Sequence, residues 1–481
     1  MLSTQLKDAI VSSVTGKYSV YVLQLLSLAI LSRIFTPEEF GVLAAAQVFV
    51  IFFQVVASSG LAPAIIYKER LTTVERNGIF TFTLLLGIAL LFLLTSITPY
   101  IFNWYGLEFG ISVFYAIGIC VFFSAISMVP LASLQKDTKF LVIARCEAIA
   151  EIFSLGISIY VFKLGYITGV EALALKLILV FVFRFALYYL SSSSSELGRA
   201  TFGRQISAIS VIFSFFKYQL AFNFLNYFSR NLDNILIAKY FGVASLGVYE
   251  KTYQVMKYPL LLFTSAINPA LQPVLTKYRN DPSLVSKEFF NIGLKLGIVG
   301  LASAFIIFWR AEEIIYVLFG DQWLAAADFL RILSISIPVQ MVLSSTGALY
   351  QSFGKTKELF YCGVFSSVFN IAAIITGVYL GSIMIICLAL CFSFSISFIQ
   401  CFLLLRARVL VLPLRKIVLL FSLVSTGWVN IFFFEDAKSN PSDIWSALLS
   451  LSIFVFSFMC AAIAAFFIWK KFAGRLTRNQ T

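Results

Sequence analysis

The sequence predicts an all-α integral membrane protein. It indicates about fourteen transmembrane helices, in two six-helix lobes related by a pseudo-two-fold axis along the membrane normal, plus a C-terminal helix pair. Of its 481 residues, 60% are hydrophobic and only 12% are charged. Its mean hydropathy is +0.93, whereas a soluble domain carries roughly 25% charged residues. The apolar windows are long enough to cross about 30 Å of hydrocarbon, and an internal repeat relates the two halves.

The N-terminal lobe is expected to occupy residues 1–190. Apolar windows between charged or polar turns predict six spans, at 18–35, 40–66, 79–102, 111–135, 140–162 and 166–190. Five consecutive serines begin at Ser191, and such polar stretches form flexible connections. Residues 191–210 are therefore predicted to be a cytoplasmic linker between the lobes.

The C-terminal lobe is expected to occupy residues 211–405. The same criteria predict six more spans, at 212–241, 246–271, 292–308, 329–353, 359–380 and 383–405. Residues 406–481 hold two further helices, at 417–434 and 444–469, and end in a basic tail. These last two helices fall outside the repeat and are predicted to be an appended pair.

The repeat aligns the two lobes at an offset of 206 residues. Residues 31–35 align with 237–241, which places Arg33 opposite Lys239. Residues 40–42 align with 246–248, which places Gly41 opposite Gly247. The unit contains six helices, so both copies point the same way through the membrane. An axis along the membrane normal is expected for such parallel repeats.

Lys and Arg in the loops predict the orientation. Most of them lie on the side of the termini, while the opposite ends hold only Arg33, Lys163, Lys239, Arg310 and Lys438. Because basic loops stay in the cytoplasm, both termini are predicted to be cytoplasmic in a multi-pass membrane protein. Attraction to anionic membrane lipid accounts for the net charge of +13, so no nucleic-acid partner is expected.

Several catalytic and cofactor sites are disfavoured. The chain has no histidine, and its seven cysteines show no CxxC spacing, so neither a metal site nor a Ser-His-Asp relay is expected. Gly354-Lys355-Thr356 resembles the end of a phosphate loop, but Leu349 stands where that motif needs glycine. The outward loops are expected to be short, the longest at 435–443. The chain is predicted not to be an enzyme and to need no cofactor.

Charged residues inside predicted spans are the best candidates for function, because a charge at the bilayer centre costs about 2.5 to 3.5 kcal/mol and should face a cavity. Many recur at helical spacing on one face. The predicted substrate-binding residues are Lys257, Lys176, Arg230, Lys251, Arg145, Gln219, Asn223, Asn226 and Gln254. The predicted coupling or charge-balancing residues are Asp233, Glu151, Glu147 and Glu250.

Purely structural roles for some of these residues stay open. Arg230 and Asp233 are three residues apart and could form an intrahelical ion pair. Glu147 and Glu151 could be partners of Arg145 and Lys176. Lys217, Arg184 and Lys295 are close enough to the cytoplasm to extend their charges to the interface. A cleft rich in cations and amides suits an anionic amphiphile, whereas a small cation would prefer carboxylates.

Several motifs remain to be placed: residues 230–234 before 246–249, Pro269 with Pro273, residues 318–323 with 330–333, and residues 350–356. In these motifs the sequence resembles the polysaccharide-transporter branch of the multidrug, oligosaccharidyl-lipid and polysaccharide (MOP) exporter superfamily, which includes the Wzx-type O-antigen flippases. The resemblance implies translocation of an undecaprenyl-pyrophosphate-linked oligosaccharide to the outer leaflet of a bacterial inner membrane by alternating access. It also implies such a lipid-linked oligosaccharide as partner, with a polysaccharide polymerase complex as a further candidate.

Two other functions remain open. A cation-coupled drug or metabolite exporter of the same superfamily would use Glu151 or Asp233 as its coupling carboxylate. A membrane-embedded sugar polymerase or acyltransferase is disfavoured by the missing histidine and the short outward loops. The excess of bases over acids in the predicted cavity favours the flippase over the exporter.

Overall fold

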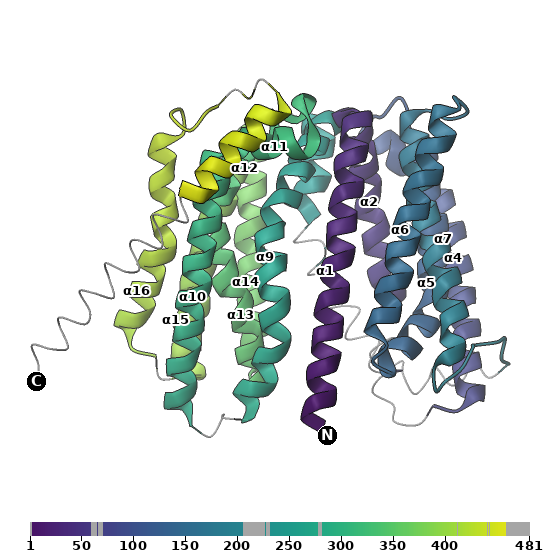
Figure 1. Cartoon of the computed structure of the whole chain (residues 1–481), viewed down its shortest axis with the longest axis horizontal. Helices are drawn as coiled ribbons and strands as arrows, with labels where there is room; N and C mark the ends of the chain where they lie inside the picture. The colour runs from purple at the N-terminus through teal and green to yellow at the C-terminus, as the bar shows by residue number, and fades with distance from the viewer. Residues whose placement is uncertain are drawn as a thin grey trace, which may run out of the picture.

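The computed structural model describes residues 2–58, 65, 71–204, 227, 231–277, 281–410, 412–439, 441 and 443–457. Every regular element in these ranges is helical (Figure 1). Seven helices are long and apolar enough to span a membrane, or eight if α12 and α13 form one bent span. The chain is therefore an all-helical, multi-pass membrane-type protein, as the hydropathy predicts.

The first group of helices runs through residue 191. It consists of α1 (Leu2–Ile34), α2 (Pro37–Ser58), α4 (Thr73–Tyr105), α5 (Ile111–Lys136), α6 (Phe140–Lys163) and α7 (Gly169–Ser191). Helix α5 packs on α4 and α7, and α6 packs on α7 and α1. Helices α5 and α6 agree with their predicted spans within one residue, whereas α1 starts sixteen residues before the predicted span.

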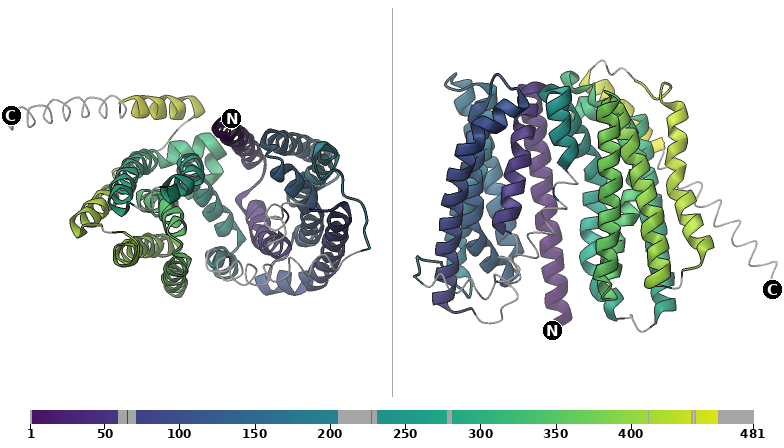
Figure 2. Two further views of the ribbon diagram at one scale, coloured as in Figure 1. Left: turned by 90° about the horizontal axis from the view of Figure 1, so that it is seen from below. Right: turned by 180° about the vertical axis from the view of Figure 1, so that it is seen from behind.

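The second group begins after residue 230. Residues 231–241 are helical. They are followed by α9 (Val243–Lys277), α10 (Pro282–Trp309), α11 (Ala311–Phe319), α12 (Ala326–Ser334), α13 (Ile337–Ser352), α14 (Thr356–Tyr379), α15 (Ile383–Arg408), α16 (Leu414–Ser425) with the 3-10 segment η4 (Thr426–Phe433), and a helix at Ile444–Ser457. Seen along the helix axes, the two groups lie side by side (Figure 2), and α2 packs against α9 between them.

Two details of the second group differ from the prediction. The axes of α12 and α13 differ by 56°, where one straight span was expected. The expectation that 435–443 is the longest outward loop is wrong, because α11 and the 3-10 turn η3 (Asp321–Trp323) occupy the connection between α10 and α12. This connection lies on the side of the molecule where α1 ends, which we call the Arg33 side.

Local signals define the helix starts. Thr72 with Glu75 and Thr168 with Glu171 form capping boxes at α4 and α7. Glu171 is thus a capping residue at the start of α7. Asp281 caps α10 by accepting a hydrogen bond from the Leu284 N–H at 3.1 Å. Hydrogen bonds from the Ser283 hydroxyl and this N–H lower the pKa of Asp281.

The described part of the predicted linker is bound to the first group rather than free. Asn77, near the start of α4, donates to the Thr201 hydroxyl at 2.7 Å and accepts from the Thr201 N–H at 3.0 Å. The Gly203 N–H donates to the Thr81 hydroxyl at 2.8 Å, and Arg76 donates to the carbonyl oxygen of Leu197. Residues up to 204 therefore move with the first group, and any hinge lies beyond them.

Candidate functional site

A cavity of about 420 Å³ lies between the two helix groups. Helices α1, α2, α6 and α7 of the first group line it on one side, and α9 of the second group lines it on the other. Of these five helices, only α2 is among the seven that are apolar enough to span a membrane by composition. Each of the other four helices places polar or charged side chains in the cavity wall, as expected from the cost of exposing charge to lipid.

Helix α9 presents a continuous polar stripe to the cavity. Gly247, Glu250, Gln254, Lys257 and Leu261 follow one another at steps of three or four residues and all line the cavity. The sequence predicted the central part of this stripe. The helix groups meet along it because α9 also packs against α2.

Four cations and two carboxylates line the cavity. The cations are Lys176, Arg184, Lys251 and Lys257, and the carboxylates are Glu151 and Glu250. Lys176 and Glu151 form an ion pair at 2.6 Å, with Glu151 almost fully buried. This pairing of Glu151 is one that the sequence left open, and it removes one cation and one carboxylate from the binding capacity of the cavity.

Lys257 and Arg184 form neither an ion pair nor a side-chain hydrogen bond among the described residues. The Nε atom of Arg184 is buried without a hydrogen-bond partner. Lys257 Nζ lies 5.1 Å from the centroid of the Tyr253 ring and interacts electrostatically with Asp233 beyond ion-pair distance. One cation comes from α7 and the other from α9, so each side of the cavity presents a cation without an ion pair in the described part of the chain.

Lys251 is the most buried of the four cations. Its Nζ donates to the Ser32 hydroxyl at 2.8 Å and lies 3.5 Å from the centroid of the Phe40 ring. The rings of Phe319 and Trp323 each lie 5.0 Å away. Aromatic faces attract cations, so these rings compensate the ammonium at the Arg33 end of the cavity.

Three glutamines add neutral hydrogen-bonding groups. Gln24, Gln47 and Gln254 come from α1, α2 and α9 and line the cavity. None of the three donates or accepts a side-chain hydrogen bond within the described protein, and the Oε1 atom of Gln254 is buried. Because each amide can both donate and accept, this wall is suited to hydroxyl groups as well as to water.

Glu147, Asp233 and Arg145 lie outside the cavity lining. Glu147 accepts a hydrogen bond from the Tyr188 hydroxyl at 2.9 Å, and Asp233 accepts one from the Tyr249 hydroxyl at 2.8 Å. The side chain of Arg145 is exposed on α6. Glu250 lines the cavity and accepts a hydrogen bond from the Asn234 side-chain amide at 3.3 Å. The predicted residues Arg230, Gln219, Asn223 and Asn226 lie outside the described residues.

Sequence reasoning missed Arg184 as a cavity residue. Its depth suggested that the guanidinium extends to the interface, whereas the structure turns it into the cavity. A signal was available, because Leu173, Lys176, Val180 and Arg184 follow at steps of three and four on α7. The helical spacing of Arg184 thus predicted that it faces the cavity, whereas its depth in the predicted span did not.

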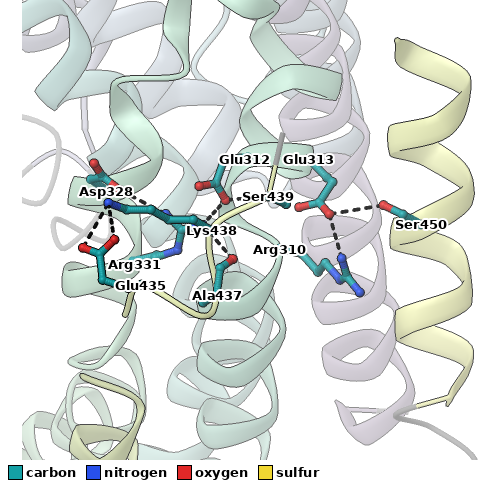
Figure 3. Close-up of polar contacts among 10 residues, drawn as sticks. All are labelled: Arg310, Glu312, Glu313, Asp328, Arg331, Glu435, Ala437, Lys438, Ser439 and Ser450. Carbon is teal, nitrogen blue, oxygen red and sulfur yellow. Dashed lines mark hydrogen bonds and ion pairs between the residues drawn. The ribbon is translucent and has the colours of Figure 1, made fainter. Parts of the chain in front are cut away.

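A second charged cluster, built around Arg331 of α12, lies on the Arg33 side, and we call it the Arg331 cluster (Figure 3). None of its residues lines the cavity. Arg331 of α12 is fully buried, donates to Asp328 Oδ1 at 3.0 Å and to the Ala437 carbonyl oxygen at 2.9 Å, and pairs with Glu312. Arg310 pairs with Glu313 at 2.7 Å, and Glu313 also accepts from the Ser450 hydroxyl at 3.2 Å. These contacts fasten the loop after η4 and the helix at Ile444–Ser457 to α11 and α12.

The comparison with known families adds to this geometry. Residues 30–328, more than half of the chain, match the family described as polysaccharide biosynthesis protein. The chain belongs to the polysaccharide biosynthesis protein family. This membership confirms the resemblance drawn from the motifs.

Two relatives match this chain in sequence over most of its length. The teichuronic acid biosynthesis protein TuaB of Bacillus subtilis (strain 168) is 23% identical over 341 residues, covering 71% of this chain and 70% of TuaB. The lipopolysaccharide biosynthesis protein WzxC of Escherichia coli (strain K12) is 23% identical over 372 residues, covering 74% of this chain and 71% of WzxC.

Solved structures show that the family member has a MOP-superfamily fold. A structure of the lipid II flippase MurJ in an inward closed conformation superimposes with a TM-score of 0.73 and 15% identity, covering 94% of this chain and 99% of MurJ. An inward-facing multidrug resistance MATE transporter gives a TM-score of 0.64 at 14% identity, covering 87% of this chain and 96% of that chain.

Proposed function

We propose that the protein is a flippase that moves an undecaprenyl-pyrophosphate-linked oligosaccharide from the cytoplasmic to the outer leaflet of a bacterial cell membrane. The observation that carries the proposal is a pair of cations, Lys257 and Arg184, which line one cavity from separate helix groups and form no ion pair among the described residues. Cations presented in this way are available to an anionic ligand, and charge-assisted hydrogen bonds are the strong ones. A diphosphate supplies two phosphate groups, and Arg and Lys are the residues that bind them.

The rest of the cavity fits the same cargo. Gln24, Gln47 and Gln254 offer hydrogen bonds to sugar hydroxyls next to the cations. Relatives named for teichuronic acid and lipopolysaccharide biosynthesis, together with the fold shared with MurJ, support a lipid-linked saccharide. The cavity volume of about 420 Å³ suits the head of such a lipid rather than all of its sugars.

The proposal includes a membrane arrangement. Two six-helix lobes, 1–190 and 211–405, would alternate around the cavity, with fourteen spans in total once the last pair in 406–481 is counted. Both termini would lie in the cytoplasm, so the Arg33 side would face the outside. The packing of α2 on α9 between the two helix groups supports this arrangement.

The test is the leaflet distribution of the lipid-linked oligosaccharide in a strain that lacks the gene. We expect loss of surface polysaccharide with the repeat unit retained on the cytoplasmic side. Complementation with Lys257→Gln or Arg184→Gln should leave transport strongly reduced. Lys295→Gln is the matched control, because Lys295 lies within α10 but is exposed and does not line the cavity. Normal surface glycan in the deletion strain contradicts the proposal.

The alternative is a cation-coupled exporter. The surroundings of the Asp233 carboxylate are the observation that favours it. This carboxylate is buried beside Tyr249 and carries no ion pair among the described residues. An exporter predicts that Asp233→Asn abolishes efflux of a drug or metabolite while surface glycan stays normal. The same deletion strain therefore separates the two functions.

A further inference from the structure

Helices α2 and α9 cross at the Arg33 end of the cavity with their backbones in direct contact. A Cβ atom on Gly41 would lie 1.7 Å from the carbonyl oxygen of Val243, and a Cβ atom on Gly247 would lie 2.0 Å from the carbonyl oxygen of Pro37. Real Cβ atoms never approach other atoms so closely. Only glycine at both positions permits this crossing, which we call the glycine crossing.

The contact is symmetric with respect to the internal repeat. Gly41 and Gly247 are equivalent at the offset of 206 residues, and so are Pro37 and Val243, the first residues of α2 and α9. Each glycine therefore contacts the start of the other repeat's helix. This reciprocal pattern, in which residue i meets residue j and j meets i, is what a two-fold axis between equivalent elements produces.

A second pair of equivalent residues repeats the pattern. Arg33 of the first group donates to the Val317 carbonyl oxygen in the second group at 2.8 Å. Its equivalent, Lys239 of the second group, donates to the Trp104 carbonyl oxygen in the first group. Both cations thus cross between the groups on the same side of the molecule, one from each repeat.

The crossing is continuous with the end of the cavity. Phe40 and Gly247 line the cavity, as does Lys251, whose ammonium is held by Ser32, Phe40 and two rings of the second group. Trp323 and Gln322 also donate to the Ser32 carbonyl oxygen, at 2.8 and 2.6 Å. The two groups are therefore joined here by aromatic, side-chain and backbone contacts.

We propose that the glycine crossing is the outer gate of the protein, closed in this structure, and that it opens by separation of α2 from α9. The inference rests on the proposed function, since a cargo released to the outer leaflet needs this end to open. It adds the residues that form the gate. Backbone contact between two glycines makes the gate bistable, because the helices either touch closely or lose the contact altogether.

The test measures access to a cysteine placed just inside the gate. Ala44 is buried, lines the cavity and lies one turn from Gly41 on α2. In intact spheroplasts, Ala44→Cys should react slowly with a membrane-impermeant maleimide applied from outside. Adding Gly41→Ala or Gly247→Ala should raise the labelling rate by about tenfold or more, because the new methyl group pushes the helices apart. The parent without Ala44→Cys gives the background of the native cysteines.

The chain provides matched glycine controls. No atom lies within 4 Å of a Cβ built on Gly156, Gly347 or Gly363, so alanine at these positions should leave the labelling rate unchanged. Equal labelling of Gly41→Ala, Gly247→Ala and the control variants, all in folded protein, overturns the proposal.

A milder pair of variants covers the case in which the glycine variants fail to fold. Arg33→Gln and Lys239→Gln remove the reciprocal side-chain contacts without adding volume, and each should increase labelling at position 44. No increase in either variant overturns the proposal as well. The assay needs no cargo, so a gate that opens in a strain with normal surface glycan would refute the flippase function while the gate stands.

Discussion

The cavity and the Arg331 cluster both hold cations, and the surroundings of these cations differ. Arg331 is fully buried and contacts Asp328 and Glu312 as well as the Ala437 carbonyl oxygen. Lys257 and Arg184 line the cavity and form no ion pair among the described residues. Lys257 is exposed and Arg184 is half-buried, so the two regions differ in the burial of their cations as well as in their partners.

The two regions also differ in how the positive charge is compensated. A charge in a low-dielectric environment is tolerated when partners supply the opposite charge. Arg331 is ion-paired within the protein, and its contacts join α11, α12 and the loop after η4 (Figure 3). Lys257 and Arg184 form no ion pair among the described residues, which leaves the cavity able to take up negative charge from a ligand.

Loss of Arg331 should have the largest effect on stability. Arg331→Met leaves Glu312 without its cationic partner, and breaking a buried pair typically costs about 3 to 5 kcal/mol. The purified protein in detergent should show a much lower melting temperature and low abundance in the membrane. A variant that melts like the parent but transports no cargo would place Arg331 in the transport machinery and remove the contrast between the two regions.

Loss of the Lys176–Glu151 ion pair should affect stability less than loss of Arg331 and more than loss of Lys257. It is an ion pair at 2.6 Å inside the cavity. A double-mutant cycle of Lys176→Met and Glu151→Gln should give a coupling of about 0.5 to 3 kcal/mol in thermal unfolding, as contacting residues do. A coupling near zero would mean that Lys176 is as free as Lys257, and that the cavity holds three available cations rather than two.

Lys257→Gln should barely change stability yet reduce transport strongly. Because the side chain is exposed and forms no ion pair or hydrogen bond among the described residues, the free energy of unfolding should change by less than about 0.5 kcal/mol. Transport of the lipid-linked oligosaccharide should fall by about tenfold or more, since a charge-assisted hydrogen bond contributes about 1.5 to 3 kcal/mol and 1.4 kcal/mol corresponds to tenfold. Destabilisation comparable to that of Arg331→Met would show that Lys257 is structural.

The exposed pair between Lys438 and Glu435 should have the smallest effect. The ammonium lies 2.9 Å from a Glu435 carboxylate oxygen, and their hydrogen bond raises the pKa of Lys438. Any stabilisation is therefore present at neutral pH and is lost as the pH rises through that pKa. Lys438→Ala should leave the melting temperature unchanged, because exposed ion pairs contribute little. A clear shift would extend the structural cluster out to this loop.

The sequence predicted the helices best where apolar windows end at strong local signals. Helices α5 and α6 match within one residue, because basic turns end one window and begin the next. The start of α10 was misplaced by ten residues, since its first turns are polar and extend beyond the apolar window. Helix α11 was missed because a nine-residue segment is too short for a spanning window.

Part of the site was also predictable. Lys176, Lys251, Lys257, Glu151, Glu250 and Gln254 all line the cavity, because helical spacing and the cost of charge in lipid identify the inward face of a helix. The pairing of these residues was not predictable. Lys176 could have met Glu147, and instead it meets Glu151, which depends on how α6 and α7 are rotated against each other.

The sequence by itself determined that this protein is an all-helical membrane protein and which helix faces are polar, and its repeat related Gly41 to Gly247. These properties follow from composition and from periodicity along one chain. Only the tertiary structure decided that Arg331 is neutralised while Lys257 is not, and that the two glycines meet at one crossing. Those outcomes depend on distances between helices far apart in the sequence, and a linear pattern carries no information on such distances.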